Sequence, residues 1–416
     1  MVINRLSVVL KMMLVLSVMV VWGCSSHEDR EIPERFQDLT DLTIIPADIQ
    51  PENTIKIKRD ISYGSTSDVL IDIVGSFAVD DSGRVYMTAG GPKGINIFNA
   101  DGRYLTRIGR EGRGPGEFAS APAIYIKSNR LYVIDIMSYR INIFSVDSLS
   151  LIRSVNINPT NKPDELTDYN IHQVLPIGNG TYLTGFDKFL RNLSELPVGS
   201  KVDTLYRRHY YFESDGRLNP KQVLEVKDQP VIVSSFFGGV GPTTFQFFDK
   251  PLIAVSNNGT IYAANSNEFL IKEYSTDGHY LRAIFHPYKN VELTREATLE
   301  DYPAMRNQVR PGISTSMLEY IIDARQRIIR QIDLPQNWPA LNDLLVDDKN
   351  RLWVSTIVED FDVYKWWVME PSGELITKFK WPRDEPIEVI KNGKIYTRET
   401  DEDTGLQRVV RYGIVM

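Results

Sequence analysis

The feature that most constrains the fold is a sequence pattern that recurs six times: a short apolar run, a polar turn and a strand carrying an aromatic residue. The clearest copies are Phe77–Thr88, Ile253–Ala264 and Leu344–Ser355. Each copy predicts two β-strands joined by a tight turn, because Asp, Asn and Gly accept the left-handed backbone that such turns need. Aligned on the second strand, the key residues are Tyr86, Tyr132, Tyr182, Tyr262, Trp353 and Tyr396. Repetition at this spacing indicates an array of similar units.

Further strands follow the copies. A third strand with alternating apolar residues comes next, as in Ile95–Phe98 and Ile141–Phe144, and another turn opens a fourth, as in Asp101–Ile108. Four short antiparallel strands per unit are typical of a propeller blade, because one such unit cannot bury both of its faces alone. We therefore expect an all-β fold, a six-bladed β-propeller of four-stranded antiparallel blades, over residues 51–416.

Three segments modify this array. The interval from Tyr182 to Tyr262 is nearly twice one blade, so a seventh blade is the alternative count. Downstream, Ser316–Glu319 matches a capping box and opens an amphipathic stretch. This predicts a short helical insertion at about 290–335, between blades four and five. Thr54–Ile57 alternates as a strand does, and we expect it to complete the last blade and close the ring.

The first residues predict an export signal. Positive charge at Arg5 precedes a nearly continuous apolar run, which stops at Cys24, the single cysteine of the chain. Val21–Cys24 resembles a lipobox, although Trp22 replaces the usual small or aliphatic residue. Residues 1–23 are therefore expected to be a lipoprotein signal peptide and Cys24 the lipidation site. An uncleaved membrane-spanning anchor is the alternative, since the run is almost long enough to span.

Charge and composition after Cys24 narrow the class of protein further. Residues 24–50 are polar and contain prolines, so we expect a tether. Ser25–Glu31 is acidic and resembles the tag that sends Bacteroidetes lipoproteins to the cell surface. The net charge is −7 and no basic cluster stands out, which argues against nucleic acid as a partner. The expected location is the cell envelope, lipid-anchored in the outer membrane.

The most suggestive motif is glycine-rich. Gly109–Gly116 carries Arg110 and Arg113, but a phosphate-binding loop needs a helix after it to supply N–H groups. Pro115 and a further strand follow instead, so we interpret the segment as a loop between blades. Arg113 could still line the mouth of the channel as an anion contact.

Little else in the sequence indicates catalysis. The five histidines lack metal-ligand spacing, and His279 and His286 are expected at the surface. There is no nucleophile elbow, so we assign no catalytic residue, no cofactor-binding residue and no metal ligand. Turn formation explains Asp80–Asp81 and Asp347–Asp348, and calcium is the one cofactor that such a pair could bind.

Aromatic residues exceed what the hairpin cores require. An exposed aromatic rim would stack on sugars or anchor a protein, whereas the favoured interpretation is packing between blades. The residues are Phe236, Phe237, Phe245, Phe247, Phe248, Trp366, Trp367 and Trp381.

Several of these segments together resemble a known group. Ile108–Phe118, Leu131–Asp135, Arg140–Phe144 and Leu344–Val354 look like the six-bladed, NHL-repeat-like propeller lipoproteins of Bacteroidetes. The resemblance covers residues 50–416 and is specific for fold, while the group is largely uncharacterised. It implies a cell-envelope protein with a binding or scaffolding role.

Two functional hypotheses follow. The first is a non-enzymatic envelope lipoprotein whose propeller binds a protein or glycan partner and whose N-terminal lipid enters the membrane. The second is a metal-dependent propeller hydrolase or lyase with its site at the central channel. Clustered His and carboxylate side chains in the channel would favour the second hypothesis, and a merely polar channel would favour the first.

Overall fold

The computed structural model describes residues 34–415, except 52, 91–93, 121, 158–161, 179, 237–238 and 301–314. The chain divides into two units, one ending at Thr40 and the other beginning at Asp41. The described part of the first unit contains a 3-10 helix, η1 (Glu34–Phe36). The expected signal peptide and Cys24 lie outside the described residues. Of the described helices, none is long and apolar enough to cross a membrane.

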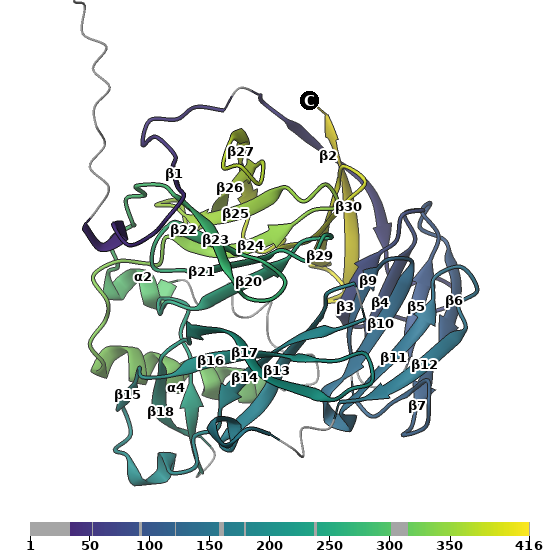
Figure 1. Ribbon diagram of the computed structural model, residues 1–416, viewed down its shortest axis with the longest axis horizontal. Coiled ribbons are helices and arrows are strands. Elements are labelled where there is room, and N and C mark those ends of the chain that lie inside the picture. Colours follow the sequence, from purple (N-terminus) through teal and green to yellow (C-terminus); the bar gives the residue numbers. More distant parts are fainter. Residues whose placement is uncertain are drawn as a thin grey trace, which may run out of the picture. The chain divides into compact units, whose positions relative to one another are not determined.

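The second unit contains six sheets that each have four antiparallel strands, one of them extended by a fifth strand, and these are the blades of a six-bladed propeller (Figure 1). Blades 1 and 2 are β3 (Val74–Val79), β4 (Val85–Ala89), β5 (Ile95–Phe98), β6 (Tyr104–Ile108), then β9 (Ala123–Lys127), β10 (Arg130–Asp135), β11 (Arg140–Ser145), β12 (Leu151–Asn156). Blades 3 and 4 are β13 (Tyr169–Pro176), β14 (Tyr182–Lys188), β16 (Tyr206–Phe212), β17 (Leu218–Lys227), then β20 (Pro251–Val255), β21 (Ile261–Asn265), β22 (Leu270–Tyr274), β23 (Tyr280–Phe285). Blades 5 and 6 are β24 (Leu341–Val346), β25 (Leu352–Ile357), β26 (Val363–Met369), β27 (Leu375–Pro382), then β28 (Ile387–Lys391), β29 (Lys394–Thr400), β30 (Gln407–Val415), β2 (Lys56–Tyr63).

The first strand of each blade is the innermost. These strands contact one another in the order β20, β24, β28, β3, β9 and β13, so they surround the central channel. The six key aromatic residues predicted from the repeat all lie on second strands, and each is at most 2 % exposed. Burying one large aromatic residue per blade supplies much of the apolar area that holds neighbouring blades together.

Aspartates at the predicted turns hold the hairpins together. In blade 5, the Asp347 carboxylate accepts hydrogen bonds from the backbone N–H of Lys349 and Arg351, from Arg351 Nε and from Trp353 Nε1. Asp80 makes the corresponding contacts in blade 1. Turn formation therefore accounts for both aspartates, as the sequence indicated.

The expected closure of the ring is confirmed. Strand β2 pairs antiparallel with β30 from Lys56↔Val415 to Tyr63↔Val409 and forms the outer strand of blade 6. Tyr63 is fully buried, and Figure 1 shows the two strands side by side. The first and last parts of the propeller sequence thus share one sheet.

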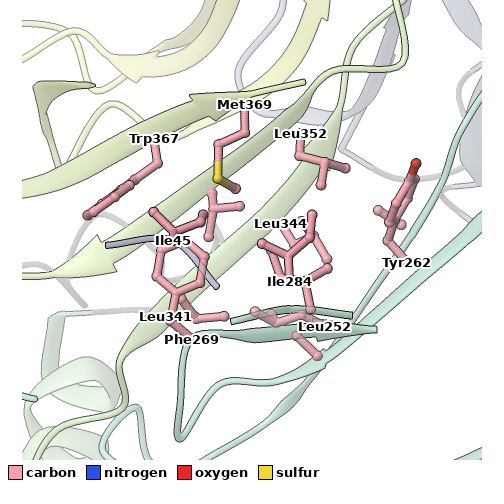
Figure 2. Close-up of a cluster of buried hydrophobic side chains, with 14 of the residues drawn as sticks. Ile45, Leu252, Tyr262, Phe269, Ile284, Leu341, Leu344, Leu352, Trp367 and Met369 are labelled. Carbon is pink, nitrogen blue, oxygen red and sulfur yellow. The ribbon is translucent and has the colours of Figure 1, made fainter. Parts of the chain in front are cut away.

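The structure revises the end of the tether, because part of the range expected there belongs to the propeller. Strand β1 (Leu42–Ile44) pairs in parallel with β23 as a fifth strand on blade 4. Ile45 then enters a buried cluster between blades 4 and 5, together with Leu341 and Trp367 (Figure 2). The polar composition of residues 24–50 conceals these few apolar residues, whose burial is a tertiary effect.

Insertions account for the long intervals. A separate three-stranded sheet stands in place of a seventh blade. Its strand β15 (Lys201–Val202) comes from a connection within blade 3, and β18 (Val231–Phe236) and β19 (Gly239–Thr243) come from the connection between blades 3 and 4. The helices α2 (Arg295–Glu300) and α4 (Thr315–Gln331) lie between blades 4 and 5, as predicted. Helix α4 begins one residue before the expected cap at Ser316. Its buried Ile328 and Ile329 pack in one cluster with Ile232 of β18.

The two ends of the propeller carry different connections. At the turn end, defined as the end where first and third strands lead into their hairpins, every connection has at most five residues. At the insertion end, second strands lead into third strands and each blade leads into the next, and residues 286–340 form the longest connection. Smaller elements at the insertion end are β7 (Arg110–Glu111), β8 (Glu117–Phe118), η2 (Ile136–Ser138), η3 (Asp164–Leu166) and η4 (Leu193–Glu195).

Candidate functional site

The turn end is held by hydrogen bonds between blades. Asn257 of blade 4 donates from its backbone N–H to Asn350 Oδ1 (2.8 Å) and from Nδ2 to the Asp348 carbonyl (3.0 Å) in blade 5. Asn392 of blade 6 donates from its N–H to Asp348 Oδ2 (2.9 Å) and from Nδ2 to the Asp81 carbonyl (3.1 Å) of blade 1. These polar turns therefore lock blades 4, 5, 6 and 1 together.

The channel carries two carboxylates near the insertion end. Asp343 of β24 and Glu388 of β28 lie on neighbouring innermost strands and keep partial exposure to solvent. Burial raises the pKa of both carboxyl groups, and the negative charge of Asp343 adds to the rise at Glu388. Lys250 opposes the rise in the pKa of Asp343. The two acids are therefore neighbours in the channel.

Glu388 already has a partner. Arg398 of β29 places Nε 2.9 Å from Glu388 Oε1 and donates from Nη2 to Oε2 (2.9 Å). The same Nη2 donates to the carbonyl of Gly75 in blade 1 (2.7 Å). A two-point contact of this kind orients the carboxylate and offsets its charge.

The innermost strands also carry neutral polar groups. Tyr125 of β9 forms a side-chain hydrogen bond with Gln173 of β13, and burial raises the pKa of the Tyr125 phenol. Within the described residues, no three His, Cys, Asp or Glu side chains come together as a metal-binding group. The described channel is thus polar, with partly compensated charges.

The histidine expectations were partly wrong. His279 lies in an exposed turn beside Asp277 (3.1 Å), as expected. His286 is 4 % exposed and packs on Trp367, with Nδ1 3.3 Å from the carbonyl oxygen of Ile45. The N-terminal segment covers His286, and a residue so distant in sequence could not be anticipated from its local pattern.

Two further histidines, His172 and His209, lie on neighbouring strands of blade 3. His172 Nδ1 is 2.7 Å from Asp187 Oδ2, and Arg207 Nε donates to Asp187 Oδ1 (2.6 Å). Neighbouring His209 is 1 % exposed, with neither ring nitrogen hydrogen-bonded within the described structure. Burial, aided by the charge of Arg207, lowers the pKa of His209 to about 3. His209 is therefore neutral at physiological pH.

The glycine-rich segment is a loop between blades. Gly109 has φ +69°, and a Cβ there would come within 2.3 Å of the Phe118 ring, so glycine is required. Glu117 accepts hydrogen bonds from the Gly114 N–H (2.7 Å) and from Arg110 Nε (2.8 Å). No helix follows, which confirms the interpretation as a loop.

The predicted aromatic rim is mostly core. Phe245, Phe247 and Phe248 stack with helix α4 in the insertion, and Trp366, Trp367 and Trp381 pack between blades, all at most 6 % exposed. The favoured interpretation, packing, is confirmed for these six, although the phenylalanines pack in the insertion instead of between blades. Phe237 and the side chain of Phe236 lie outside the part of the chain that the structure describes.

Exposed apolar side chains gather at one end. Of the thirteen large exposed hydrophobic residues among those described, nine lie in connections of the insertion end and four on blade strands. Within the described hairpins of the turn end there is none. The nine are Leu70, Met137, Tyr139, Phe189, Leu196, Val198, Val240, Met317 and Tyr320. Sequence reasoning missed them because a hydrophobic residue in a loop can be buried or exposed.

One pocket opens in this end. It has a volume of about 380 Å³ and lies along the connection from Lys188 to Val202 in blade 3. Phe189 and Leu196 supply apolar walls, and Arg191 forms an ion pair with Asp168 (2.9 Å) at its border.

Comparison with known protein families agrees with the fold. Residues 55–171 match the family DUF5128, described as a 6-bladed beta-propeller. No match is found among curated proteins. A Bacteroides fragilis protein described as exported is 11 % identical, with a TM-score of 0.47, covering 90 % of this chain and 99 % of that chain.

Two enzymes also match in structure. Aldose sugar dehydrogenase from Streptomyces coelicolor is 9 % identical, with a TM-score of 0.43, covering 88 % of this chain and 100 % of that chain. Virginiamycin B lyase from Staphylococcus aureus is 9 % identical, with a TM-score of 0.39, covering 87 % and 100 %. Identities this low say nothing about activity. The chain is a six-bladed β-propeller whose residues 55–171 are similar to the 6-bladed beta-propeller family.

Proposed function

We propose that this protein is a cell-envelope binding or scaffolding module whose insertion end docks a partner, a protein or a glycan. The observation that carries the proposal is the uneven distribution of exposed apolar side chains between the two ends. Exposed apolar side chains that are concentrated at one end of a protein often mark a place where another molecule binds. The turn end, with its short polar hairpins, has no such surface in the described residues.

Some of these side chains stand on rigid supports. Leu70 is 73 % exposed, although its neighbours Val69 and Ile71 are at most 6 % exposed. Ser65 Oγ donates to the Ile71 carbonyl and accepts from the Ile71 N–H, both at 2.9 Å. A fixed anchor loses little conformational entropy on binding, so it contributes more to affinity.

The connection after β10 has similar support. Asp135 accepts hydrogen bonds from the Ala119 N–H and from Ser120 Oγ, both at 2.6 Å. The following residues display Met137, 76 % exposed, and Tyr139, which adopts a left-handed φ of 49°. Such a conformation is costly for a bulky residue and persists only where surrounding contacts hold it.

The chemistry of the surface favours a protein partner. Leu70, Met137 and Val198 are aliphatic or thioether side chains, which fill apolar pockets of proteins but give no stacking face to a sugar. The pocket beside Phe189 supports the glycan as the second candidate. It combines an exposed ring with the polar groups of Arg191 and Asp168.

Anchoring by Cys24 completes the proposal. Export and lipidation would place the propeller at the envelope, most simply at the outer membrane, with residues 25–40 as its tether. Metabolic labelling with a palmitate analogue tests this part directly. Label should enter the unmodified chain and be absent from Cys24→Ser, and label in both chains would contradict it.

A positional crosslinking experiment tests the docking surface. A photoreactive amino acid is placed at Leu70, Met137 or Val198, and, as matched controls, at Leu105 and Ile152 on fourth strands. The expected result in the producing cells is one adduct, formed from the insertion-end positions alone. Equal adducts from all five positions, or none, would contradict the proposal. Binding on a glycan array that is lost in Phe189→Ala would identify the glycan instead.

A further inference from the structure

The first strand of blade 2 ends in Lys127, whose side chain leaves its own blade at the turn end. Its Nζ donates to the carbonyl oxygens of Ser256 (2.8 Å) and Pro176 (3.4 Å). Pro176 ends the first strand of blade 3, and Ser256 directly follows that of blade 4. The stem passes Gly178, where an added Cβ would lie 3.2 Å from Lys127 Cε. The ends of three innermost strands therefore meet at this ammonium, at the turn end of the propeller.

The charge of Lys127 has no counter-charge in the described structure. Burial alone lowers the pKa of Lys127 to about 8, with no contribution from any charged side chain. Two arginines with little exposure are paired: Arg351 Nε lies 2.7 Å from Asp347 Oδ2, and Arg207 contacts both Asp187 and Asp228. Lys378, like Lys127, instead donates to a backbone carbonyl, that of Ile49. An unpaired ammonium that is largely removed from water is costly.

Blade 6 provides an internal comparison. Lys391 occupies the same place as Lys127, at the end of a first strand and directly before a two-residue turn. Its Nζ lies 2.5 Å from Asp81 Oδ1 in blade 1. The same position thus carries a paired lysine in one blade and an unpaired lysine in another.

We propose that Lys127 is the floor of a binding site inside the channel for an oxyanion, the carboxylate or phosphate group of a small ligand. An ammonium has three N–H donors, and the two carbonyls account for two of them. The third donor would form a charge-assisted hydrogen bond to the anion, roughly twice as strong as one between neutral groups. The bound anion would also supply the missing counter-charge.

Other polar side chains of the channel are placed where they could contact a ligand whose anionic group binds Lys127. Tyr125 precedes Lys127 by two residues on β9, so their side chains lie on the same side of the strand. Tyr125 packs against the buried cluster of blades 2 and 3, so the polar groups that it offers a ligand are its hydroxyl and the side chain of its partner Gln173. Asp343 and Glu388 lie near the starts of their strands, at the insertion end. A ligand bound here would place its anionic group at Lys127, at the turn end of the channel.

The test uses the tag-free chain from Ser25 onward and two probes, inorganic phosphate and acetate. Thermal melts are recorded at constant ionic strength, with acetamide as the neutral control. Ligand that binds only the folded state raises the melting midpoint as its concentration exceeds the dissociation constant. The expected result is stabilisation of the unmodified chain and of Lys391→Met, and its loss in Lys127→Met. Stabilisation by only one probe identifies the kind of oxyanion.

Equal stabilisation of all three chains, or of none, would overturn the proposal. A second measurement does not depend on whether Lys127→Met folds. Selective isotope labelling of the lysine side chains allows the pKa of Lys127 to be followed by NMR in the unmodified chain. Anion binding should raise this pKa, by about one unit for a tenfold preference for the charged form. An unchanged pKa would refute anion binding and would leave the crosslinking result for the insertion end untouched.

Discussion

The turn end and the insertion end of the propeller are built from the same strands, yet they are stabilised and exposed in different ways. At the turn end, short hairpins use buried aspartates such as Asp347 to satisfy their own backbone and tie neighbouring blades through Asn257 and Asn392. At the insertion end, long connections expose Leu70 and Met137. Stabilising contacts and exposed apolar side chains are therefore concentrated at opposite ends, so the exposed surface can vary at little cost to the fold.

The largest expected effect on stability comes from removing β2, the strand from the N-terminal side that closes the ring with β30. A chain that begins at Gly64 lacks β2, which leaves β30 as an unpaired edge, removes Tyr63 and exposes the cluster in which Tyr63 packs. We expect it to lose its cooperative thermal transition, as measured by circular dichroism. A chain that begins at Asp41 keeps both β1 and β2 and serves as the control. If both melt alike, β2 does not close the ring.

Replacing a buried aspartate of the turn end should have the next largest effect on the free energy of unfolding. Asp347→Asn removes the charge that pairs with Arg351 and leaves a buried donor without its acceptor. We expect a loss of about 3 kcal/mol in the free energy of unfolding, measured by urea denaturation. Asp277→Asn, in an exposed turn of the same end, should change it by less than about 0.5 kcal/mol. Equal effects would show that burial is not the cause.

The links between turns should contribute less. Asn392→Gly keeps the left-handed backbone (φ 54°) that this position needs but removes the side-chain hydrogen bond to Asp81. We expect a cost of about 1 kcal/mol in the free energy of unfolding. Gly393→Ala, at a position with φ +64° and no atoms near its Cβ, separates backbone strain from the lost contact. No change in Asn392→Gly would mean that the turns do not stabilise one another.

A channel carboxylate should give a small, pH-dependent effect. Burial raises the pKa of Asp343 above its ordinary value of 3.8, so the folded state holds this proton more tightly than the unfolded state. The resulting stability is complete below the unfolded pKa and is lost as the pH rises through the folded pKa. Asp343→Asn should therefore be more stable than the unmodified chain at pH 7, and the difference should vanish below about pH 4. Urea midpoints measured from pH 3 to 7 check this, and a difference that grows on acidification would have the wrong sign.

The smallest effect on stability is expected at the insertion end. Leu70→Ser and Met137→Ser alter side chains that contact mainly solvent, so each should change the free energy of unfolding by less than about 0.5 kcal/mol. The crosslinking yield to a partner should nevertheless fall in both. A large loss of stability would mean that these residues hold the fold, and the contrast between the two ends would fail.

Much of the fold could be predicted because its signals are local. Tyr86 and Trp353 follow turns of recognisable composition, and strand alternation identifies the segment that became β2. The site was harder to predict. Asp343, Glu388 and Lys127 each lie in an unremarkable strand, and only the closing of the ring brings Lys127 to Ser256 of a blade more than a hundred residues away.

The sequence by itself determined the blade, its repetition and its turns, because strand alternation and left-handed turn residues act between near neighbours in the chain. The tertiary structure decided which side chains are buried, paired or exposed. His286 is covered by Ile45 and Leu70 is exposed, although their local patterns suggest the reverse. Burial depends on what the rest of the chain places beside a residue, and in a closed ring that neighbour is often remote in sequence.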